Sequence, residues 1–496
     1  AIAPSRPSRV YAQIMSGSNA GYVGLGVWRS DDGGTTWLKR DTGTTFPGSF
    51  GGFAWYFGEF GVDPNNADVC WALGVSLLRS SDGGVTWSDV SGVLHPDQHA
   101  FWVDPLNSNH QYIGDDGGFW STNDGATWSH CDDLPISQFY AGAVDPSNTN
   151  HVIGGLQDNN TVQTSAGPTA YTAVLGGDGF VPLIDPVTPS VVFSEYQFCC
   201  SGSGFKRSTT GGGSPASTSG WTSSDRFNWC TPIVMNPRNH FTLLAGSQYL
   251  YRSTNNGRNW AKISTKDFTT STPSSLTYCT ITALEISKPD TNTYYVGTDD
   301  GNVWRSIDRG ANWTAITTGL PRQYVTRLTA DPVDANVVYC TLSGYTQDNQ
   351  SALVFRSADK GTTWTNLSAN LPNVPANDIL VDPANTQVLY LATDLGVYAS
   401  KTQGAGWFEL GTGMPLNSVA DLALDAGTRQ LFAFTHGRSA WKLDLTSIPA
   451  GVDAPRAPSG LALALAGANP TRGTVRLGLT LARAAHAQVT VHDALG

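Results

Sequence analysis

Charged side chains are scarce in this sequence: Asp, Glu, Lys and Arg make up 14% of its 496 residues, where about a quarter is ordinary. The net charge is −11, and no run of five or more basic residues occurs. Because an acidic surface without a basic stripe repels phosphate backbones, we expect no nucleic-acid partner. Surface polarity must come mainly from Ser, Thr, Asn and Gly.

Long apolar runs and several catalytic signatures are also missing. The longest apolar stretches have about five to eight residues, whereas a membrane-spanning helix needs about 20. There is no G-x-S-x-G elbow, no H-E-x-x-H helix and no phosphate-binding loop. We therefore expect no membrane-spanning segment and none of these three chemistries. The N-terminus has neither Met nor a signal peptide, which predicts a processed or trimmed mature chain.

Cysteine spacing gives no metal-binding pattern. No two of the seven cysteines form a C-x-x-C pair, and Cys199 and Cys200 are adjacent. Long-range disulfides would suit an exported protein, and buried free thiols are the alternative. The spacing leaves both open.

What the sequence does contain is a repeat. Apolar strands alternate with tight turns in a unit that recurs at intervals of mostly about 40 to 53 residues, the length of one four-stranded propeller blade. Ten turns mark the units, and the residues at these turns are Pro4, Pro64, Pro105, Pro146, Pro186, Pro237, Pro289, Pro332, Pro383 and Asp425. The repeat predicts an all-β propeller of about ten four-stranded blades.

A box of the form S-x-D-x-G-x-T-W follows the third strand of most units. Clear copies begin at Ser30, Ser80 and Ser357, and weaker copies occur elsewhere. The Asp side chain can accept backbone N–H groups of a hairpin turn, while the Trp can pack between neighbouring sheets. The box aspartates are therefore predicted to be turn residues and not catalytic residues. Seven tryptophans are predicted to be structural wedges: Trp37, Trp87, Trp128, Trp260, Trp313, Trp364 and Trp407.

These boxes resemble the Asp-box (BNR) repeats of sialidases, family 74 glycoside hydrolases and sortilin-type receptors. Phrases in residues 95–198, such as "HPDQHAFWVDP", "GDDGGFW", "GGLQDNN", "GGDGFVPLIDP" and "SEYQF", resemble bacterial sortilin-like, family 74-like exported proteins. The resemblance implies a secreted, extracellular or cell-surface bacterial protein. It favours a single ten-bladed ring, and two rings are the alternative.

Domain boundaries follow from composition. Residues 1–447 are predicted to form the propeller, and the Pro/Gly/Ala-rich residues 448–459 a linker. Residues 460–496 contain two alternating strands, "TVRLGLTL" and "AQVTVHDALG". They resemble the Ig-like tail modules of bacterial exported proteins and are predicted to be an incomplete β-sandwich.

The strand order predicts which face of the propeller carries the site. The Asp-Pro turns and the boxes share one face, so the blade connections and the second-to-third-strand turns share the other. Polar residues not needed for turns gather on this second face, where glycines would let a ligand approach the backbone. The predicted site residues are Asp97, His99, Asp115, Asp116, Gln157, Asp158, Asp178, Glu195, Gln197, Asp394 and His436.

Three functions fit this set. The first is binding of a polysaccharide, a peptide or a cell-surface protein without chemistry. The second is glycoside hydrolysis of the endo-β-glucanase or xyloglucanase type by two carboxylates. Asp116 and Asp394 are the catalytic candidates, because their turns resemble the T-D-x-G-G turn of family 74 enzymes, although Thr is absent before Asp116 and the second Gly after Asp394. The third is a structural scaffold with Ca²⁺ bound near Asp97, Asp115 and Asp116; no cofactor is required otherwise.

Sialidase chemistry is disfavoured, because it needs an arginine triad for the substrate carboxylate. Five arginines simply precede the box serine on blade strands, and no early R-I-P phrase is present. These arginines are Arg29, Arg79, Arg252, Arg305 and Arg356.

Overall fold

A computed structural model describes residues 1–17, 21–41, 45–164, 170–274, 277–447, 462–465 and 477–480. Ten antiparallel sheets follow one another along residues 10–444 of this part of the chain, eight with four strands and two with three. In each sheet the strands pair in sequence order. The predicted all-β propeller fold is therefore confirmed. We number the sheets as blades 1 to 10 in chain order.

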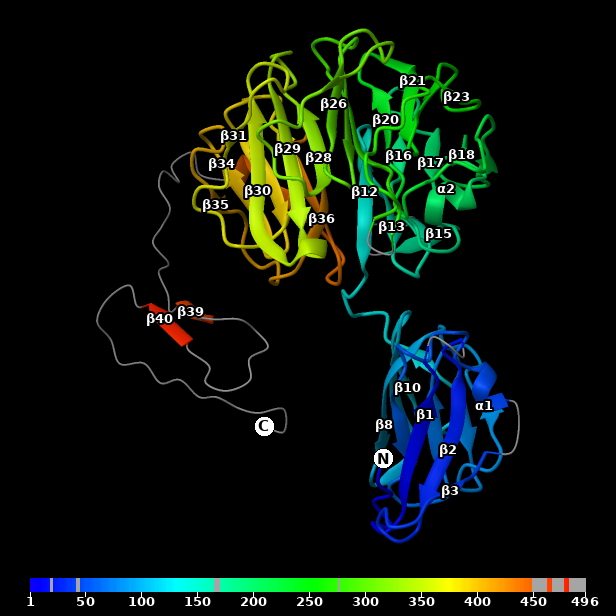
Figure 1. Cartoon of the computed structure of the whole chain (residues 1–496). Helices are drawn as coiled ribbons and strands as arrows, with labels where there is room; N and C mark the ends of the chain where they lie inside the picture. Colours follow the sequence, from blue (N-terminus) through cyan, green and yellow to red (C-terminus); the bar gives the residue numbers. More distant parts are fainter. Residues whose placement is uncertain are drawn as a thin grey trace.

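Blades 1 to 3 form one group, drawn in blue to cyan in Figure 1. Its strands are β1 (Val10–Met15), β2 (Gly24–Ser30), β3 (Leu38–Lys39), β4 (Phe60–Val62), β5 (Cys70–Leu73), β6 (Leu77–Ser80), β7 (Ser88–Asp89), β8 (Gln98–Asp104), β9 (Asn107–Asp115), β10 (Gly118–Thr122) and β11 (Ser129–His130). A short helix, α1 (Thr45–Gly48), lies between β3 and β4. We call this set the three-blade group.

Blades 4 to 7 begin the second and larger group. Their strands are β12 (Phe139–Asp145), β13 (Asn148–Leu156), β14 (Thr161–Thr164), β15 (Tyr171–Leu175), β16 (Leu183–Ile184), β17 (Val192–Ser194), β18 (Lys206–Ser208), β19 (Ala216–Ser217), β20 (Ile233–Asn236), β21 (Asn239–Gly246), β22 (Leu250–Ser253), β23 (Ala261–Lys262), β24 (Ile281–Ile286), β25 (Tyr294–Thr298), β26 (Val303–Ser306) and β27 (Thr314–Ala315). A one-turn element, α2 (Gln197–Ser201), follows β17.

Blades 8 to 10 complete that group. Their strands are β28 (Tyr324–Ala330), β29 (Val338–Gly344), β30 (Asn349–Ser357), β31 (Thr365–Asn366), β32 (Ala376–Val381), β33 (Leu389–Thr393), β34 (Gly396–Ser400), β35 (Phe408–Glu409), β36 (Val419–Asp425), β37 (Gln430–Thr435) and β38 (Ala440–Asp444). Two 3-10 turns, η2 (Tyr345–Gln347) and η3 (Leu445–Ser447), accompany them.

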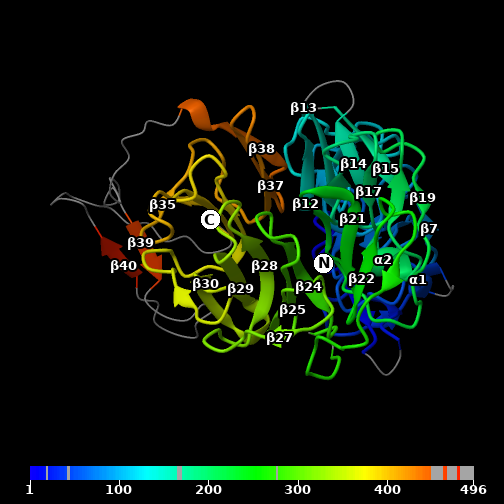
Figure 2. The same cartoon turned by 90° about the horizontal axis from the view of Figure 1, so that it is seen from above.

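Blades 4 to 10 close on themselves. Viewed from above, the last blade (β36 to β38) lies beside the first blade of this group (β12 and β13) in Figure 2. The Gly142 N–H of β12 donates a 3.0 Å hydrogen bond to Oδ2 of Asp421 on β36. The rings of Phe139 and Phe434 are in contact at 5.6 Å, and residues Gln138 and His436 form a β-bridge. Residues 139–444 are thus a seven-bladed ring, which we call the ring.

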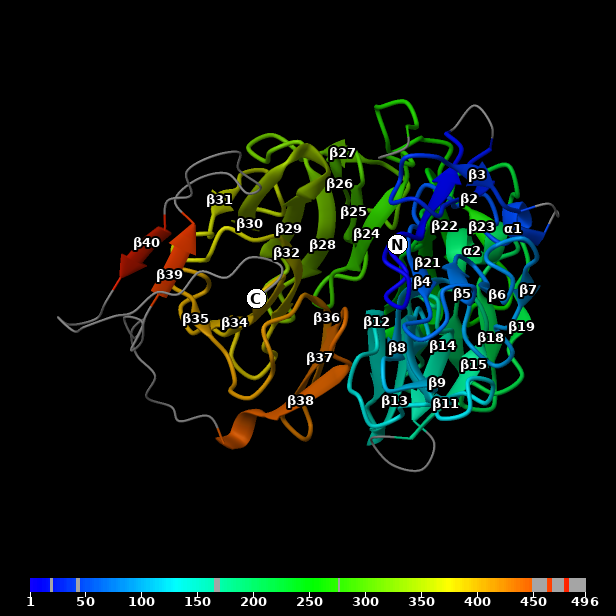
Figure 3. The ribbon, with the colours of Figure 1, turned by 90° about the horizontal axis from the view of Figure 1, so that it is seen from below.

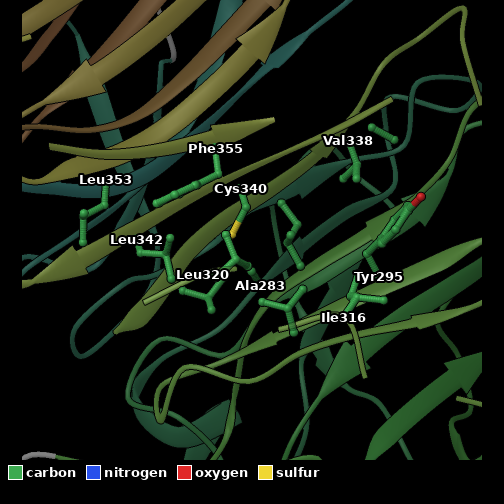
Figure 4. Packing of buried hydrophobic residues seen from close by; sticks show 13 residues of the cluster. Ala283, Tyr295, Ile316, Leu320, Val338, Cys340, Leu342, Leu353 and Phe355 are labelled. Carbon is green, nitrogen blue, oxygen red and sulfur yellow. The ribbon is translucent and has the colours of Figure 1, made fainter. Parts of the chain in front are cut away.

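Buried apolar clusters explain why closure occurs at seven blades. Each of the seven junctions between neighbouring blades of the ring has one such cluster, including the closing junction between blades 10 and 4. Figure 4 shows the cluster between blades 7 and 8, where Tyr295 and Ile316 meet Val338 and Phe355. Each fully buried side chain of this size contributes about 1.5–3 kcal/mol.

The favoured single ten-bladed ring is therefore corrected: seven blades close into one ring, and the two-ring alternative is nearer to the structure. The repeat spacing predicts the length of each blade but not where the ring closes. Ring closure depends on which blade faces bury apolar surface against each other. In the three-blade group, clusters join blades 1 and 2 and blades 2 and 3. In Figure 3, seen from below, this group is drawn in front of the half of the ring that contains β12 to β23, and its loops contact the turn between β13 and β14.

The box tryptophans show the direction of packing. Trp87 of blade 2 and Trp128 of blade 3 each pack back against the preceding blade and expose 9% and 8% of their surface. Trp260 and Trp407 do the same in the ring, at 4% and 2%. Trp37 of blade 1 has no preceding blade in the described structure and is 44% exposed.

The boxes form turns as expected. Asp32 accepts the Thr36 N–H at 2.8 Å and the Thr36 hydroxyl at 2.6 Å, and the Ser30 hydroxyl donates to it at 2.7 Å. These bonds, led by the Thr36 hydroxyl, lower the pKa of Asp32 to about 2. Such an engaged carboxylate serves the turn.

The C-terminal prediction is tested only in small part. Strands β39 (Ala462–Leu465) and β40 (Leu477–Thr480) pair antiparallel, and β40 lies within the predicted first strand. The predicted linker 448–459 and the second strand of the module lie outside the described residues. All seven cysteines are unpaired, and five of them are buried.

Candidate functional site

Two loops of the three-blade group contact one loop of the ring. The loop before β8 places His95 so that its Nε2 lies 3.1 Å from the carbonyl oxygen of Asp158. The Nδ2 of Asn159 donates a 2.6 Å hydrogen bond to the carbonyl oxygen of Asp116, in the turn between β9 and β10. Residues 157–160 form the turn between β13 and β14. A blade connection and a second-to-third-strand turn of the three-blade group therefore meet a second-to-third-strand turn of the ring.

Two carboxyl groups face each other across this contact. The carboxyl groups of Asp116 and Asp158 come close enough to interact. Burial, and next the Asp116 carboxyl, raise the pKa of Asp158. The Nε2 of His99 lies 2.8 Å from Oδ1 of Asp116. Asp97 lies nearby, and its pKa is raised by burial and then by the charge of Asp158. The contact is therefore an acidic cluster.

The ring loop is held in an unusual backbone conformation. Asp158 has a φ of +56°. Residues other than Gly rarely adopt this backbone conformation, which costs about 1–3 kcal/mol. Its N–H donates a 2.7 Å hydrogen bond to Oδ1 of Asp178, and Gln197 Nε2 donates to Oδ2 of Asp178 at 2.6 Å. Burial raises the pKa of Asp178. These bonds fix Asp158 toward the three-blade group.

The same loop leads to the central channel of the ring. The Oε1 of Gln157 lies 2.9 Å from Nε2 of His436, and burial lowers the pKa of His436 while the charge of Asp394 opposes that shift. The Oδ1 of Asp394 accepts Asn377 Nδ2 at 2.9 Å and the Ser418 hydroxyl at 2.8 Å. Asp116 and Asp394 therefore belong to one continuous polar network.

A cavity of about 320 Å³ occupies the channel. Its polar lining includes Tyr140, Tyr324, Arg327, Asn377, Asp394 and His436. Arg327 pairs with Asp378 at 2.6 Å and with Asp421, so its charge is neutralised inside the ring. The volume lies at the lower end of small-molecule sites and is open to the polar network described above.

An aromatic loop lies beside the acidic cluster. Phe53, Trp55 and Tyr56, between α1 and β4, expose 53%, 63% and 60% of their surfaces. The ring of Tyr56 contacts the ring of His99 at 5.2 Å. Exposed aromatic rings next to carboxyl groups offer a flat apolar surface together with hydrogen-bonding groups, which suits the faces and hydroxyls of a sugar.

Nine of the eleven predicted site residues join this network, and two lie apart from it. Asp115 is buried within blade 3, where its Oδ1 accepts the Gly117 N–H at 2.9 Å and Trp120 Nε1 at 3.0 Å. Glu195 is fully buried, its Oε1 accepts the Thr231 N–H at 2.8 Å, and burial raises its pKa well above the ordinary value. Alternation along the strands could not distinguish these inward-facing acids from their neighbours.

Sequence reasoning missed His95, Tyr56 and Tyr140. His95 precedes Pro96 in the quoted phrase "HPDQH", but only the approach of the ring loop gives it a partner. Tyr56 lies in an irregular segment without a motif. Tyr140 sits on β12, where its ring stacks on Phe180 at 4.6 Å and contacts His436 at 5.4 Å.

Metal and membrane sites are not found in the described part of the chain. No group of three or more His, Cys, Asp and Glu residues there is placed to hold a metal ion. The Ca²⁺ hypothesis for Asp97, Asp115 and Asp116 stays a prediction without support from this geometry. None of the described helices has the length and apolar character required to span a bilayer.

Comparison with known proteins agrees with the fold. A family model described as the DUF6242 beta propeller domain matches residues 231–381. A 117-residue stretch is 32% identical to a xyloglucanase of Hypocrea jecorina, and it covers 21% of this chain and 14% of that protein. A 129-residue stretch is 28% identical to a xyloglucanase of Paenibacillus, and it covers 23% of this chain and 13% of that protein.

A solved structure of a GH74 enzyme from Niastella koreensis aligns with 89% of this chain and 83% of that chain, with 14% identity and a TM-score of 0.32. The sequence matches span about one seventh of the curated xyloglucanases. The chain is thus a β-propeller protein with a short, xyloglucanase-like stretch.

Proposed function

We propose that this protein is an extracellular glycoside hydrolase that cleaves a β-glucan such as xyloglucan where the three-blade group contacts the ring. One observation carries the proposal: the carboxyl groups of Asp116 and Asp158 come together at this contact, beside the exposed aromatic loop of Phe53, Trp55 and Tyr56. Inverting and retaining glycosidases both need a carboxylic acid that keeps its proton near neutral pH. The short similarity to xyloglucanases supports the choice of polysaccharide.

In this proposal the Asp116–Asp158 pair gives its proton to the oxygen of the scissile glycosidic bond. Burial and the neighbouring carboxyl keep the pKa of Asp158 raised, so the pair can act as an acid. Asp394 acts as the base and takes a proton from the water that attacks the anomeric carbon. The bond from this carbon to the leaving oxygen breaks, Asp394 then releases its proton to solvent, and the pair takes up a proton from solvent.

Supporting groups hold the reacting carboxyls in position. His99 contacts Asp116 at 2.8 Å, and the Asn377 and Ser418 donors orient Asp394. The His436–Gln157 contact links the two halves of the site. The aromatic loop would bind sugar units by stacking, which excludes water from the cluster.

The experiment is release of oligosaccharides from xyloglucan and from a mixed-linkage β-glucan. Asp116→Asn and Asp158→Asn should each lower kcat at least about 100-fold, the usual effect of removing a general acid. Asp124→Asn, in the box turn of the same blade, is the matched control and should cleave like wild type. Turnover that survives both cluster variants would exclude this pair.

Binding without hydrolysis is the second candidate, and one observation favours it. The Asp116 carboxyl acts directly on the Asp158 carboxyl, whereas the two carboxyls of a glycosidase are held about 5–9.5 Å apart. If Asp394 does not serve as the second carboxylate, the cluster can only bind. Tight binding of xyloglucan by wild type with no product release would establish this candidate.

A further inference from the structure

A second pocket opens on the ring, and none of its lining residues belongs to the contact with the three-blade group. It has a volume of about 360 Å³ and lies between the segment that follows β17 and the loops that precede β20 and β24. Its apolar lining is Phe198, Phe227, Pro273 and Tyr278, and its polar lining includes Ser223 and Arg226. We call it the rim pocket.

The wall of the rim pocket is a left-handed turn. Phe198, Cys199, Cys200 and Ser201 have φ values between +50° and +56°, a run that costs roughly 1–2 kcal/mol for each residue. Cys200 N–H donates to the Tyr196 carbonyl at 2.8 Å, and Gly202 N–H donates to the Phe198 carbonyl at 2.9 Å. Strain of this size persists where the surrounding structure enforces it, and such places are often ligand sites.

Aromatic rings connect this pocket to the channel. From His436 the ring contacts run through Tyr140, Phe180, Trp229 and Phe198 to Tyr278, with centroid separations of 5.4, 4.6, 5.9, 5.1 and 5.5 Å. Phe180 is fully buried, while Tyr278 is 40% exposed at the pocket. The row thus runs from half-buried His436, through buried Phe180, to exposed Tyr278.

Arg226 supplies a polar group with fixed geometry. Its Nε donates to the Cys279 carbonyl at 3.2 Å, and its Nη2 donates to Asp267 at 2.8 Å and to the Thr269 hydroxyl at 3.3 Å. Because these acceptors hold the guanidinium and balance its charge, the pocket offers hydrogen bonds and apolar faces without a strong net field. Neutral hydroxylated ligands suit such a lining better than ions do.

We propose that the rim pocket is a second saccharide-binding site, which holds the same polysaccharide chain that passes the acidic cluster. The proposal rests on the proposed function for its choice of ligand. Tyr278 and Phe198 would contact the apolar face of a sugar ring, and Arg226 with Ser223 would contact its hydroxyls. A chain that reaches both sites gains affinity that a short oligosaccharide cannot, because the second contact is intramolecular.

The test uses the full chain with the Asp116→Asn substitution, which suppresses turnover, and measures binding of polymeric xyloglucan and of xyloglucan oligosaccharides by calorimetry. Adding Tyr278→Ala should weaken binding of the polymer roughly tenfold and leave binding of the short oligosaccharides within about twofold. Phe241→Ala is the matched control, because Phe241 is 50% exposed on the ring and outside the row, and it should change neither.

Each outcome decides something. Polymer binding that is unchanged by Tyr278→Ala overturns the rim site while leaving the proposed hydrolase in place. Polymer binding that depends on Tyr278 in a protein without hydrolytic activity supports the rim site and overturns the hydrolase. No binding of either ligand by wild type overturns both.

Discussion

The box tryptophans of the three-blade group can be replaced one at a time. The losses in free energy of unfolding then show how much of each side chain's contribution to stability comes from packing against the preceding blade. Trp87 exposes 9% of its surface and contacts Phe46 and Phe60 at 5.5 and 6.0 Å, whereas Trp37 exposes 44%. A Trp side chain can bury about 150–250 Å², so the difference of 35 percentage points is roughly 50–90 Å². At about 25 cal/mol per Å² this area is worth about 1–2 kcal/mol.

Trp87→Ala should therefore destabilise the group by about 3–5 kcal/mol, as buried Trp-to-Ala changes do, and Trp37→Ala by about 1–2 kcal/mol less. Urea unfolding followed by far-UV circular dichroism compares the two variants within the same group of blades. Trp55→Ala, a 63% exposed Trp outside the boxes, is the control and should cost under about 1 kcal/mol. Equal losses for Trp37→Ala and Trp87→Ala would refute the wedge account.

Two further predictions concern pH. Burial raises the pKa of Glu285, on β24, to about 8. Wild-type stability should therefore fall by an amount on the order of 1–3 kcal/mol as pH rises from about 4 toward 8. Glu285→Gln should remove this pH dependence, as measured by thermal unfolding. Burial acts to raise the pKa of Asp82, but hydrogen bonds from the Thr86 hydroxyl and N–H outweigh burial and lower this pKa to about 2. Asp82→Ala should thus lower stability by about 1 kcal/mol at pH 7, and this difference in stability from wild type should vanish as pH falls from about 4 to about 2. A constant difference in stability across that range, measured by acid titration, would contradict the turn role of Asp82.

The repeat predicted the blades because each blade is specified locally. Turn residues, alternating strands and the box all act within about 50 residues, so their spacing can be read along the chain. Ring closure is not local, because it depends on whether Phe139 finds Phe434 and whether Asp421 reaches the Gly142 N–H almost 300 positions away. The repeats do not specify which blades meet to close a ring, so their number alone favours a single ten-bladed ring.

The candidate site was predicted only in part, because local strand order places residues on a face but does not specify their distant partners. Strand order placed Gln157, Asp158 and His436 on one face, and they do form one network. The partner of Asp158, however, is supplied by the three-blade group, and its identity depends on how the group lies against the ring. Glu195 shows the converse limit, because a buried acid that bonds to the Thr231 N–H has the same sequence signature as a site carboxylate.

A double-mutant cycle with Asp116→Asn and Asp158→Asn tests the central claim most directly. We predict that the two effects on kcat/KM for xyloglucan are coupled by at least about 1 kcal/mol, because the Asp116 carboxyl acts on the Asp158 carboxyl across the contact between the group and the ring. Effects that add within about 0.3 kcal/mol would contradict a common site.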